Sequence, residues 1–242
     1  MKKLATTLFL FILLCYLITA VTVLSTHKPT QTCTGIKITI NDSTNTPTLT
    51  QADIHNTLKE AHLNPIGLPL DSINLAHIDT LLNQHPLIKH TTTYKTPGGH
   101  IHIHITPRHP ILHIIPNNGH PYYIDSDGNT IPTTNLHTPL IVATGNITPH
   151  YAAHTLAPLA NQIENDPFWH NQTQQINTLT NQQIELITRI GTHTIQLGTP
   201  NNIEEKLNKT KQFLTQTLRQ TGWNKYKEIN LEYHNQIICK KQ

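Results

Sequence analysis

Residues 100–105 alternate strictly between histidine and isoleucine, within the stretch GGHIHIHITPRHP that spans 98–110. In a β-strand, successive side chains point to opposite faces, so this pattern separates a polar face from an apolar one. The polar face, which we call the histidine ladder, consists of His100, His102 and His104, and the apolar face of Ile101, Ile103 and Ile105. We expect the isoleucines to pack against a layer of helices and the ladder to face solvent.

The flanking sequence supplies the rest of this layer. Thr50 and Asp53 form a capping-box pattern before one helical repeat, and Asn74 is a typical N-cap before a second repeat that Pro86 ends. Pro97 and the two glycines after it are typical of a turn between strands. The expected elements are a strand at 35–40, helices at 52–63 and 74–86, and strands at 88–94 and 100–106. The order β-α-α-β-β predicts a small α+β domain.

The N-terminal segment is uncharged between Lys3 and Lys28. As a helix, residues 4–25 would span about 33 Å, enough to cross a bilayer core. A cleaved signal peptide has a shorter apolar core and a small-residue cleavage site, which VTVLST does not resemble. We therefore predict an uncleaved transmembrane helix whose flanking lysines place the N-terminus in the cytoplasm and the rest of the chain outside it. The expected anchor residues are Leu4, Phe9, Phe11, Leu14, Leu17, Val21 and Leu24.

Composition narrows the classes of function. A formal charge of +3, without any Lys/Arg run, does not favour nucleic-acid binding. The 18 histidines are scattered from His27 to His234, which indicates compositional bias rather than a metal site. The three cysteines have no metal-ligand or redox spacing, and a disulfide between Cys33 and Cys239 stays open.

Sequence motifs for catalysis are absent, because the chain has no H-E-x-x-H, G-x-S-x-G, P-loop or dinucleotide fingerprint. The histidine ladder could bind zinc in principle, but three residues of one strand face are a cramped ligand set. Asp125, Asp127 and Asn129 suggest a calcium loop, yet Thr130 and Leu136 stand where an EF-hand needs glycine and glutamate. We predict a β-turn at this place and no metal site.

The region from His109 onward is typical of a β-meander with added helices. Strands are expected at 111–115, 122–125, 174–179, 184–190 and 193–198, and the alternating stretch KEINLEYHNQIIC predicts one closing strand at 227–239. Thr148 is an N-cap candidate, and Pro158 is expected to break or kink the helix that follows it. Apolar residues at helical spacing predict a long helix over 203–218. The region is predicted to be a mostly antiparallel β-domain with a C-terminal helix and strand.

Several of these segments, in this order, resemble the cell-division family FtsQ/DivIB. The resemblance rests on His85-Pro86 before a strand, Arg108-His109-Pro110 after the hairpin, and the turn from Tyr122 to Gly128. It continues through 185–198 and 222–241, which resemble the Bacteroidota form in particular. The resemblance implies a cytoplasmic tail (1–3), a transmembrane helix (4–25), a linker (26–34), a POTRA domain (35–108) and an FtsQ/DivIB-type β-domain (109–242).

The resemblance also implies a function. Members of this family are non-enzymatic, single-pass proteins of the inner membrane, with their C-terminal domains in the periplasm at the division septum. They need no cofactor, metal, nucleic acid or small-molecule substrate. FtsB, together with FtsL, is the expected main partner, and other division proteins are expected to bind through the POTRA domain. An alternative is a POTRA-containing factor for outer-membrane protein assembly or secretion, and another is a periplasmic enzyme with a histidine-bound metal.

In the family, FtsB binds the end of the β-domain by adding a strand to the sheet edge. Carried over to this chain, the resemblance points to the closing strand from Ile229 to Cys239 and to the helix before it. The candidate partner-binding residues are Ile229, Leu231, Tyr233, Asn235, Gln236, Ile237 and Ile238.

Overall fold

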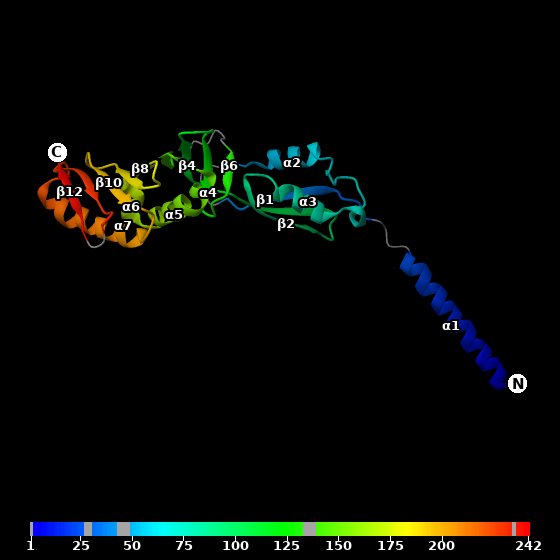
Figure 1. Ribbon diagram of the computed structural model, residues 1–242. Helices are drawn as coiled ribbons and strands as arrows, with labels where there is room; N and C mark the ends of the chain where they lie inside the picture. Colours follow the sequence, from blue (N-terminus) through cyan, green and yellow to red (C-terminus); the bar gives the residue numbers. More distant parts are fainter. Residues whose placement is uncertain (1, 27–30, 43–48, 133–138, 234–235) are drawn as a thin grey trace. The chain divides into compact units, whose positions relative to one another are not determined.

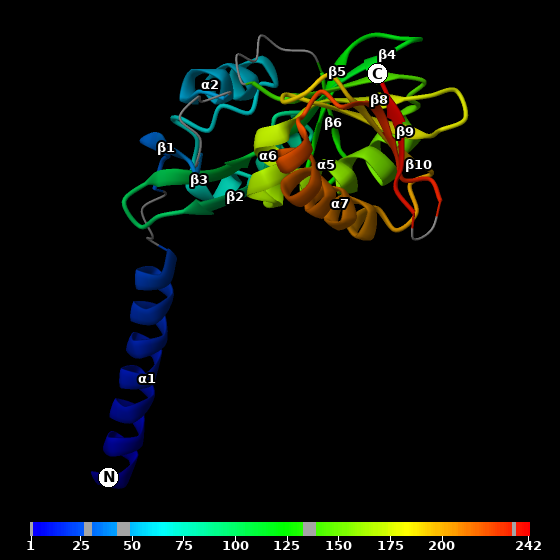
Figure 2. The ribbon, with the colours of Figure 1, turned by 90° about the vertical axis from the view of Figure 1, so that its left-hand side faces the viewer.

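The computed structural model describes residues 2–26, 31–42, 49–132, 139–233 and 236–242. The chain divides into two compact units, whose elements Figures 1 and 2 show from two sides. The first unit comprises Met1–Thr39, Gln51–Leu81 and Thr92–His104, and the second comprises Ile40–Thr50, Leu82–Thr91 and Ile105–Gln242.

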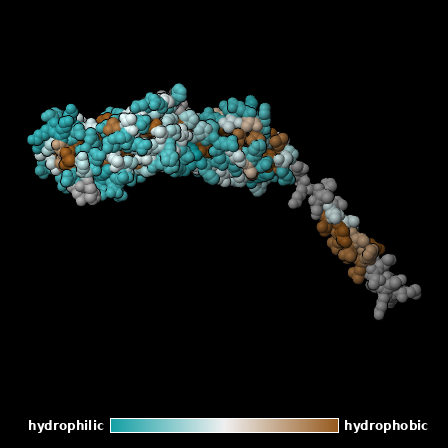
Figure 3. Space-filling model, in the orientation of Figure 1, coloured by the Kyte–Doolittle hydropathy of each residue, from teal (hydrophilic) through white to brown (hydrophobic). Residues whose placement is uncertain are grey.

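The N-terminal segment forms the helix α1, Lys2–Thr26. Its described apolar side chains are exposed, and Figure 3 shows them in the colour of hydrophobic residues; they include Phe9, Phe11, Leu14, Leu17 and Val21. The side chains of Leu4 and Leu24 lie outside the described residues. In the part of the chain that the structure describes, no helix has both the length and the apolar character that crossing a membrane requires. The transmembrane anchor stays a prediction.

The first sheet has the strand order β1-β3-β2. Its strands are β1 (Gly35–Ile40), β2 (Ile88–Lys95) and β3 (His100–Pro107), and the helices between β1 and β2 are α2 (Gln51–Glu60), the 3-10 turn η1 (Leu70–Ser72) and α3 (Leu75–Asn83). The Asn74 side chain caps α3, because its Oδ1 accepts a hydrogen bond from the His77 N–H at 3.3 Å. The predicted order β-α-α-β-β is confirmed.

The two faces of β3 lie as the HIHIHI pattern predicts. The three isoleucines of this strand are fully buried, as are Ile54 and Leu58 of α2 and Ile78 and Leu82 of α3. In contrast, His100 is exposed and His102 and His104 are half-buried. The core of this small domain is therefore determined by alternation in one strand and by helical spacing in two helices.

The second sheet has nine described strands in the order β12-β11-β10-β9-β8-β7-β4-β5-β6. They are β4 (Pro110–Pro116), β5 (Tyr122–Asp125), β6 (Thr130–Pro132), β7 (Ile141–Gly145), β8 (Thr173–Thr178), β9 (Ile184–Thr188), β10 (Thr194–Gly198), β11 (Tyr226–Asn230) and β12 (Ile238–Lys241). The sheet is mixed, which corrects the expectation of a mostly antiparallel domain: β4–β7, β7–β8 and β10–β11 pair in parallel. The reason is that helices connect β7 to β8 and β10 to β11, and such crossovers return the chain in the same direction.

Helices cover one face of this sheet (Figure 2). They are α4 (Pro149–Tyr151), the π-helical turn η2 (Ala152–Leu156), α5 (Ala157–Asn165) and α6 (Pro167–Gln172), followed after β10 by α7 (Ile203–Gln212), the π-helical turn η3 (Phe213–Leu218) and α8 (Arg219–Thr221). Thr148 caps α4 through its Oγ1, which accepts the Tyr151 N–H at 3.2 Å. Pro158 does not break the helix, because the wider π-turn before it accommodates the ring.

The two faces of the second sheet differ in polarity. The core lies between the helices and the sheet and includes Leu186 and Ile195 from the strands and Trp169 from α6. The opposite face carries hydrogen-bonded polar pairs between neighbouring strands, namely Gln175–Thr144 (2.7 Å), Asn177–Glu185 (2.9 Å) and Asn230–Gln196 (2.9 Å). Because helices cover a single face of this sheet, its other face is polar, and its two edges are places at which another chain can bind.

Candidate protein-binding edge

The C-terminal hairpin forms one end of the second sheet. β11 pairs in parallel with β10 and antiparallel with β12, and β12 comes last in the strand order. One edge of β12 is therefore unpaired in the described part of the chain. Such an edge presents backbone N–H and C=O groups to which an extended segment of another protein can add a strand.

The single closing strand predicted at 227–239 is wrong, because the chain turns after Asn230. The Asn230 Oδ1 accepts a hydrogen bond from the Glu232 N–H at 2.8 Å, and this local bond competes with strand pairing. The Leu231 N–H still donates to the Gln196 carbonyl oxygen (2.9 Å). The free edge is consequently Ile238–Lys241, whereas the predicted one was Ile229–Cys239.

Three of the candidate partner-binding residues are covered by the protein itself. Ile229 is 0% and Leu231 is 3% exposed, and both belong to the hydrophobic core. Ile237 is half-buried against the same core. Ile229 and Leu231 therefore hold the hairpin in place and offer no surface to a partner, whereas Ile237 is only partly accessible.

The accessible candidates are Tyr233, Gln236 and Ile238. Tyr233 is 57% and Ile238 is 47% exposed, and Gln236 is exposed as well. Asn235 lies outside the described residues. Since apolar and aromatic side chains supply most of the affinity in protein interfaces, Tyr233 and Ile238 are the better anchors.

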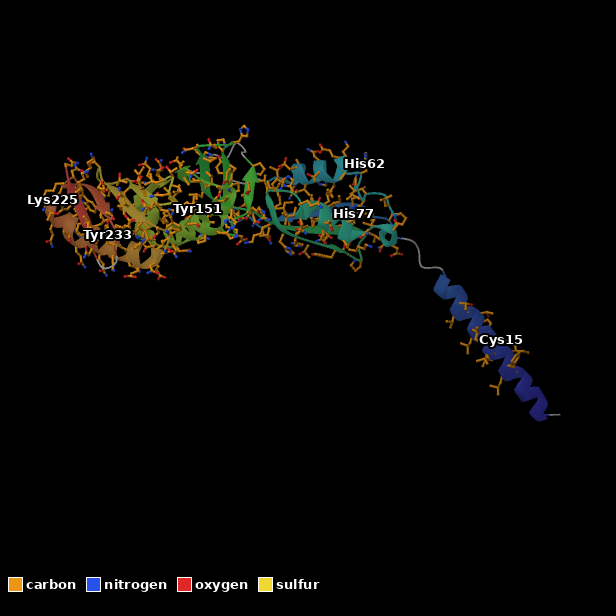
Figure 4. All side chains as sticks on the ribbon, viewed as in Figure 1. Cys15, His62, His77, Tyr151, Lys225 and Tyr233 are labelled. Carbon is orange, nitrogen blue, oxygen red and sulfur yellow. The ribbon has the colours of Figure 1, made fainter. Side chains whose placement is uncertain are left out.

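The edge strand is positively charged. Lys240 and Lys241 of β12 are exposed, as is Lys225 before β11, and Figure 4 shows Lys225 and Tyr233 in this terminal region. Cys239 is half-buried, and burial raises the pKa of its thiol. All three cysteines are free in this structure, and Cys33 and Cys239 belong to different units. The lysines were missed because the predicted strand stopped at Cys239, although lysine is the residue that commonly guards an edge.

A small cavity of about 220 Å³ lies beside the hairpin. It is lined by Leu231, Tyr233 and Gln236 of the hairpin and by α7 residues that include Lys206. The Lys206 Nζ donates to the carbonyl oxygens of Leu197 (2.7 Å) and Thr199 (2.8 Å), and burial lowers its pKa. This lysine therefore ties α7 to the end of β10, and the cavity forms a recess next to the exposed tyrosine.

The histidine ladder has an aromatic neighbour that the sequence pattern did not reveal. The Tyr94 hydroxyl on β2 lies 3.3 Å from His102 Nδ1 and 3.1 Å from His104 Nε2. Desolvation and the nearby Lys37 charge lower the pKa of His102. Among the described residues, no group of three or more histidine, cysteine or acidic side chains is placed to hold a metal ion. Here the ladder makes an aromatic cluster on a solvent face.

Two of the sequence motifs meet at the start of the second sheet. The Arg108 guanidinium forms a largely buried ion pair with Asp125, with 2.6 Å between Nη1 and Oδ2. The other Asp125 oxygen accepts the N–H groups of Asp127 (3.0 Å) and Asn129 (2.7 Å). Asp125 thus organises the turn between β5 and β6, which confirms the prediction of a turn at this place.

The described residues thus form a small α+β module and a mixed sheet whose terminal strand β12 has an unpaired edge among them. A model of the POTRA-like domain matches residues 31–106, and the family model described as "FtsQ/DivIB, C-terminal related" matches residues 109–240. The chain therefore belongs to the FtsQ/DivIB C-terminal-related family, and the resemblance inferred from its motifs is confirmed. This membership indicates a cell-division protein, and the family is generally non-catalytic. A search of curated proteins found no match.

Proposed function

We propose that this protein is a membrane-anchored, periplasmic scaffold of the cell-division complex that binds FtsB, together with FtsL, at the free edge of β12. The observation that carries the proposal is the edge of the strand Ile238–Lys241 that is unpaired among the described residues, at the end of an FtsQ/DivIB-related domain. A scaffold needs an open docking surface, and this edge offers both backbone and side-chain contacts.

Strand addition alone would bind weakly. In a strand of four residues, about half of the backbone groups point away from β11, which leaves about four hydrogen bonds of about 1 kcal/mol each. Micromolar affinity requires about 8 kcal/mol, before any cost of ordering the partner. Side chains must therefore contribute the rest, and Tyr233, Ile238 and the exposed lysines of β12 are the groups available. The lysines favour a partner segment that carries acidic residues.

The anchor and the location are part of the proposal. Their support is the uncharged segment between Lys3 and Lys28 and the exposed apolar side chains of α1. A reporter enzyme that is active only outside the cytoplasm, fused after Gln242, should be active. A chain whose mature N-terminus lies near residue 26 would contradict the anchor.

Site-specific photo-cross-linking in cells tests the partner. A photoreactive residue at Ile238 should form adducts with FtsB or FtsL. The matched control is Ile115, an exposed isoleucine of the same sheet on the internal strand β4, 39% exposed compared with 47% for Ile238. Adducts with outer-membrane precursors would favour the assembly factor instead. Adducts of equal yield at both positions would contradict a specific edge.

Proline substitution separates backbone from side-chain contacts. Neighbouring residues of a strand point their N–H groups in opposite directions, so Cys239→Pro and Lys240→Pro each remove a donor from a different side of β12. One of the two variants should lose FtsB binding while the hairpin stays folded. Lys240→Ala keeps the N–H and should bind more tightly than Lys240→Pro. Wild-type affinity in both proline variants would exclude strand addition at this edge.

A further inference from the structure

A tight turn at residues 65–68 exposes two apolar side chains on the first unit. The Leu68 N–H donates to the Pro65 carbonyl oxygen (3.1 Å), and Gly67 has a φ of +86°, as a type II turn requires at its third position. Ile66 and Leu68, on either side of this glycine, are each 49% exposed. The turn therefore presents a pair of large apolar side chains at its tip.

The turn is held in one conformation by its base. The Gly67 N–H donates to the Cys33 carbonyl oxygen and the Cys33 N–H donates to the Leu68 carbonyl oxygen, both at 2.8 Å. Pro65 and Cys33 are buried beneath it. Because the backbone is already ordered, contact through this tip costs little conformational entropy.

The composition of the turn favours an apolar, uncharged partner. Residues 64–70 carry no charged side chain. Among the described residues outside α1 and the C-terminal hairpin, the remaining large apolar side chains that are exposed lie singly on other segments. Single exposed apolar residues are ordinary, whereas two in one rigid turn mark a contact surface.

The chain itself ties this turn to α1. The Leu70 N–H donates to the Gln31 carbonyl oxygen at 2.8 Å, so the residues after the turn are hydrogen-bonded to the segment 31–33. Gln31 follows Thr26, the last residue of α1, by five residues, which can span at most about 18 Å. A surface that holds the end of α1 is therefore within reach of the turn. Because the linker between them is short, the effective concentration of that surface at the turn is high, and even a weak contact can form.

We propose that the Ile66-Gly67-Leu68 turn is a lipid-contact tip, which inserts its two apolar side chains into the interface of the bilayer that holds α1. This inference rests on the proposed membrane anchor. The tip supplies apolar burial in the interfacial region, as membrane-surface segments do, and it orients the first unit relative to the lipid.

Fluorescence quenching by brominated lipids tests the tip in the full chain. Leu68→Trp, and Ile66→Trp as a second variant, are reconstituted in phosphatidylcholine vesicles with and without bromine on the acyl chains. The matched control is His90→Trp, an exposed position on β2 that lies five residues, or about 17 Å of extended strand, before the end of β2 at Lys95. The turn of the β2–β3 hairpin at Pro97 lies near the Ile66-Gly67-Leu68 turn, because Gln31 contacts both Pro97 and Leu70: the Pro97 carbonyl oxygen accepts the Gln31 Nε2–H at 2.6 Å. Flotation of the vesicles after an alkaline wash measures separately whether the chain stays anchored in the bilayer.

We expect the chain to float and the tip tryptophans to lose emission in brominated lipid, with no loss for His90→Trp. A floating chain whose tip tryptophans are not quenched overturns the lipid contact and leaves the anchor intact. A blue-shifted but unquenched emission overturns it too, since it shows that protein covers the tip. A chain that does not float overturns both the anchor and the tip.

Discussion

The buried Arg108–Asp125 ion pair gives the sharpest test of how the second unit is stabilised. The side chains of Arg108 and Asp125 are only 18% and 4% exposed, so removal of the arginine leaves a carboxylate that water reaches poorly. We therefore expect Arg108→Met, which keeps an unbranched apolar stem and removes the charge, to destabilise this unit.

The structure sets the magnitude. Removing one partner of a buried ion pair costs about 3–5 kcal/mol. Asp125 retains hydrogen bonds from the Asp127 and Asn129 N–H groups, and Arg108 is not fully buried. The expected loss is consequently smaller, about 2–3 kcal/mol. Asp125→Asn combined with Arg108→Met should cost less than the sum of the single changes, because no unpaired charge remains.

Urea unfolding of the full chain, followed by tryptophan fluorescence, measures this effect. The two tryptophans, Trp169 and Trp223, both belong to the second unit, so their emission reports its unfolding. The matched control is Arg189→Met, which removes an exposed arginine from the same unit and should change stability by less than about 0.5 kcal/mol. If Arg108→Met is as stable as this control, the ion pair does not stabilise the unit and the reasoning is refuted.

Three further predictions concern stability. Gly145→Ala should cost at least about 2 kcal/mol in urea unfolding, because Gly145 has a φ of +110° and an added Cβ would meet the Thr178 carbonyl oxygen of the neighbouring strand. His193 is 3% exposed and burial lowers its pKa, so protonation opposes folding. The free energy of unfolding should be highest above the unfolded-state pKa of histidine, about 6.5, and should fall as the pH drops through the folded-state pKa of His193. The variant His193→Leu should lose less stability over this pH range, as measured by thermal unfolding at a series of pH values. Replacing the whole histidine ladder by threonine should shift the stability of the first unit by less than about 1 kcal/mol, measured by circular dichroism, and a larger loss would assign the Tyr94 cluster a structural role.

Local signals in the sequence were sufficient to predict the first unit. The HIHIHI alternation, the Asn74 cap and the turn at Pro97 each act over a few residues, and each one is present where it was expected. Such signals are reliable because the period of side chains in a strand or helix follows directly from backbone geometry. The same kind of signal predicted the Asp125 turn and the strands β4, β5, β8, β9 and β10, whereas β6 and β7 were not predicted.

Contacts between distant residues decided what local patterns could not. Alternation over 227–239 predicted a strand through Ile229, but the burial of Ile229, the turn at Asn230 and the position of Ile238–Lys241 at the sheet edge depend on partners far away in the chain, such as Gln196. The pairing of Arg108 with Asp125 and the contact of Tyr94 with the histidine ladder also join separate segments.

The physical reason is that a side-chain pattern specifies which face of a strand is buried, whereas the choice of neighbouring strand depends on where the whole chain returns. By itself, the sequence therefore determined most of the elements, the buried faces of β3, α2 and α3, and the family to which the chain belongs. The tertiary structure decided the mixed order of the second sheet, the edge that stays open, and which of the candidate partner-binding residues a partner can reach.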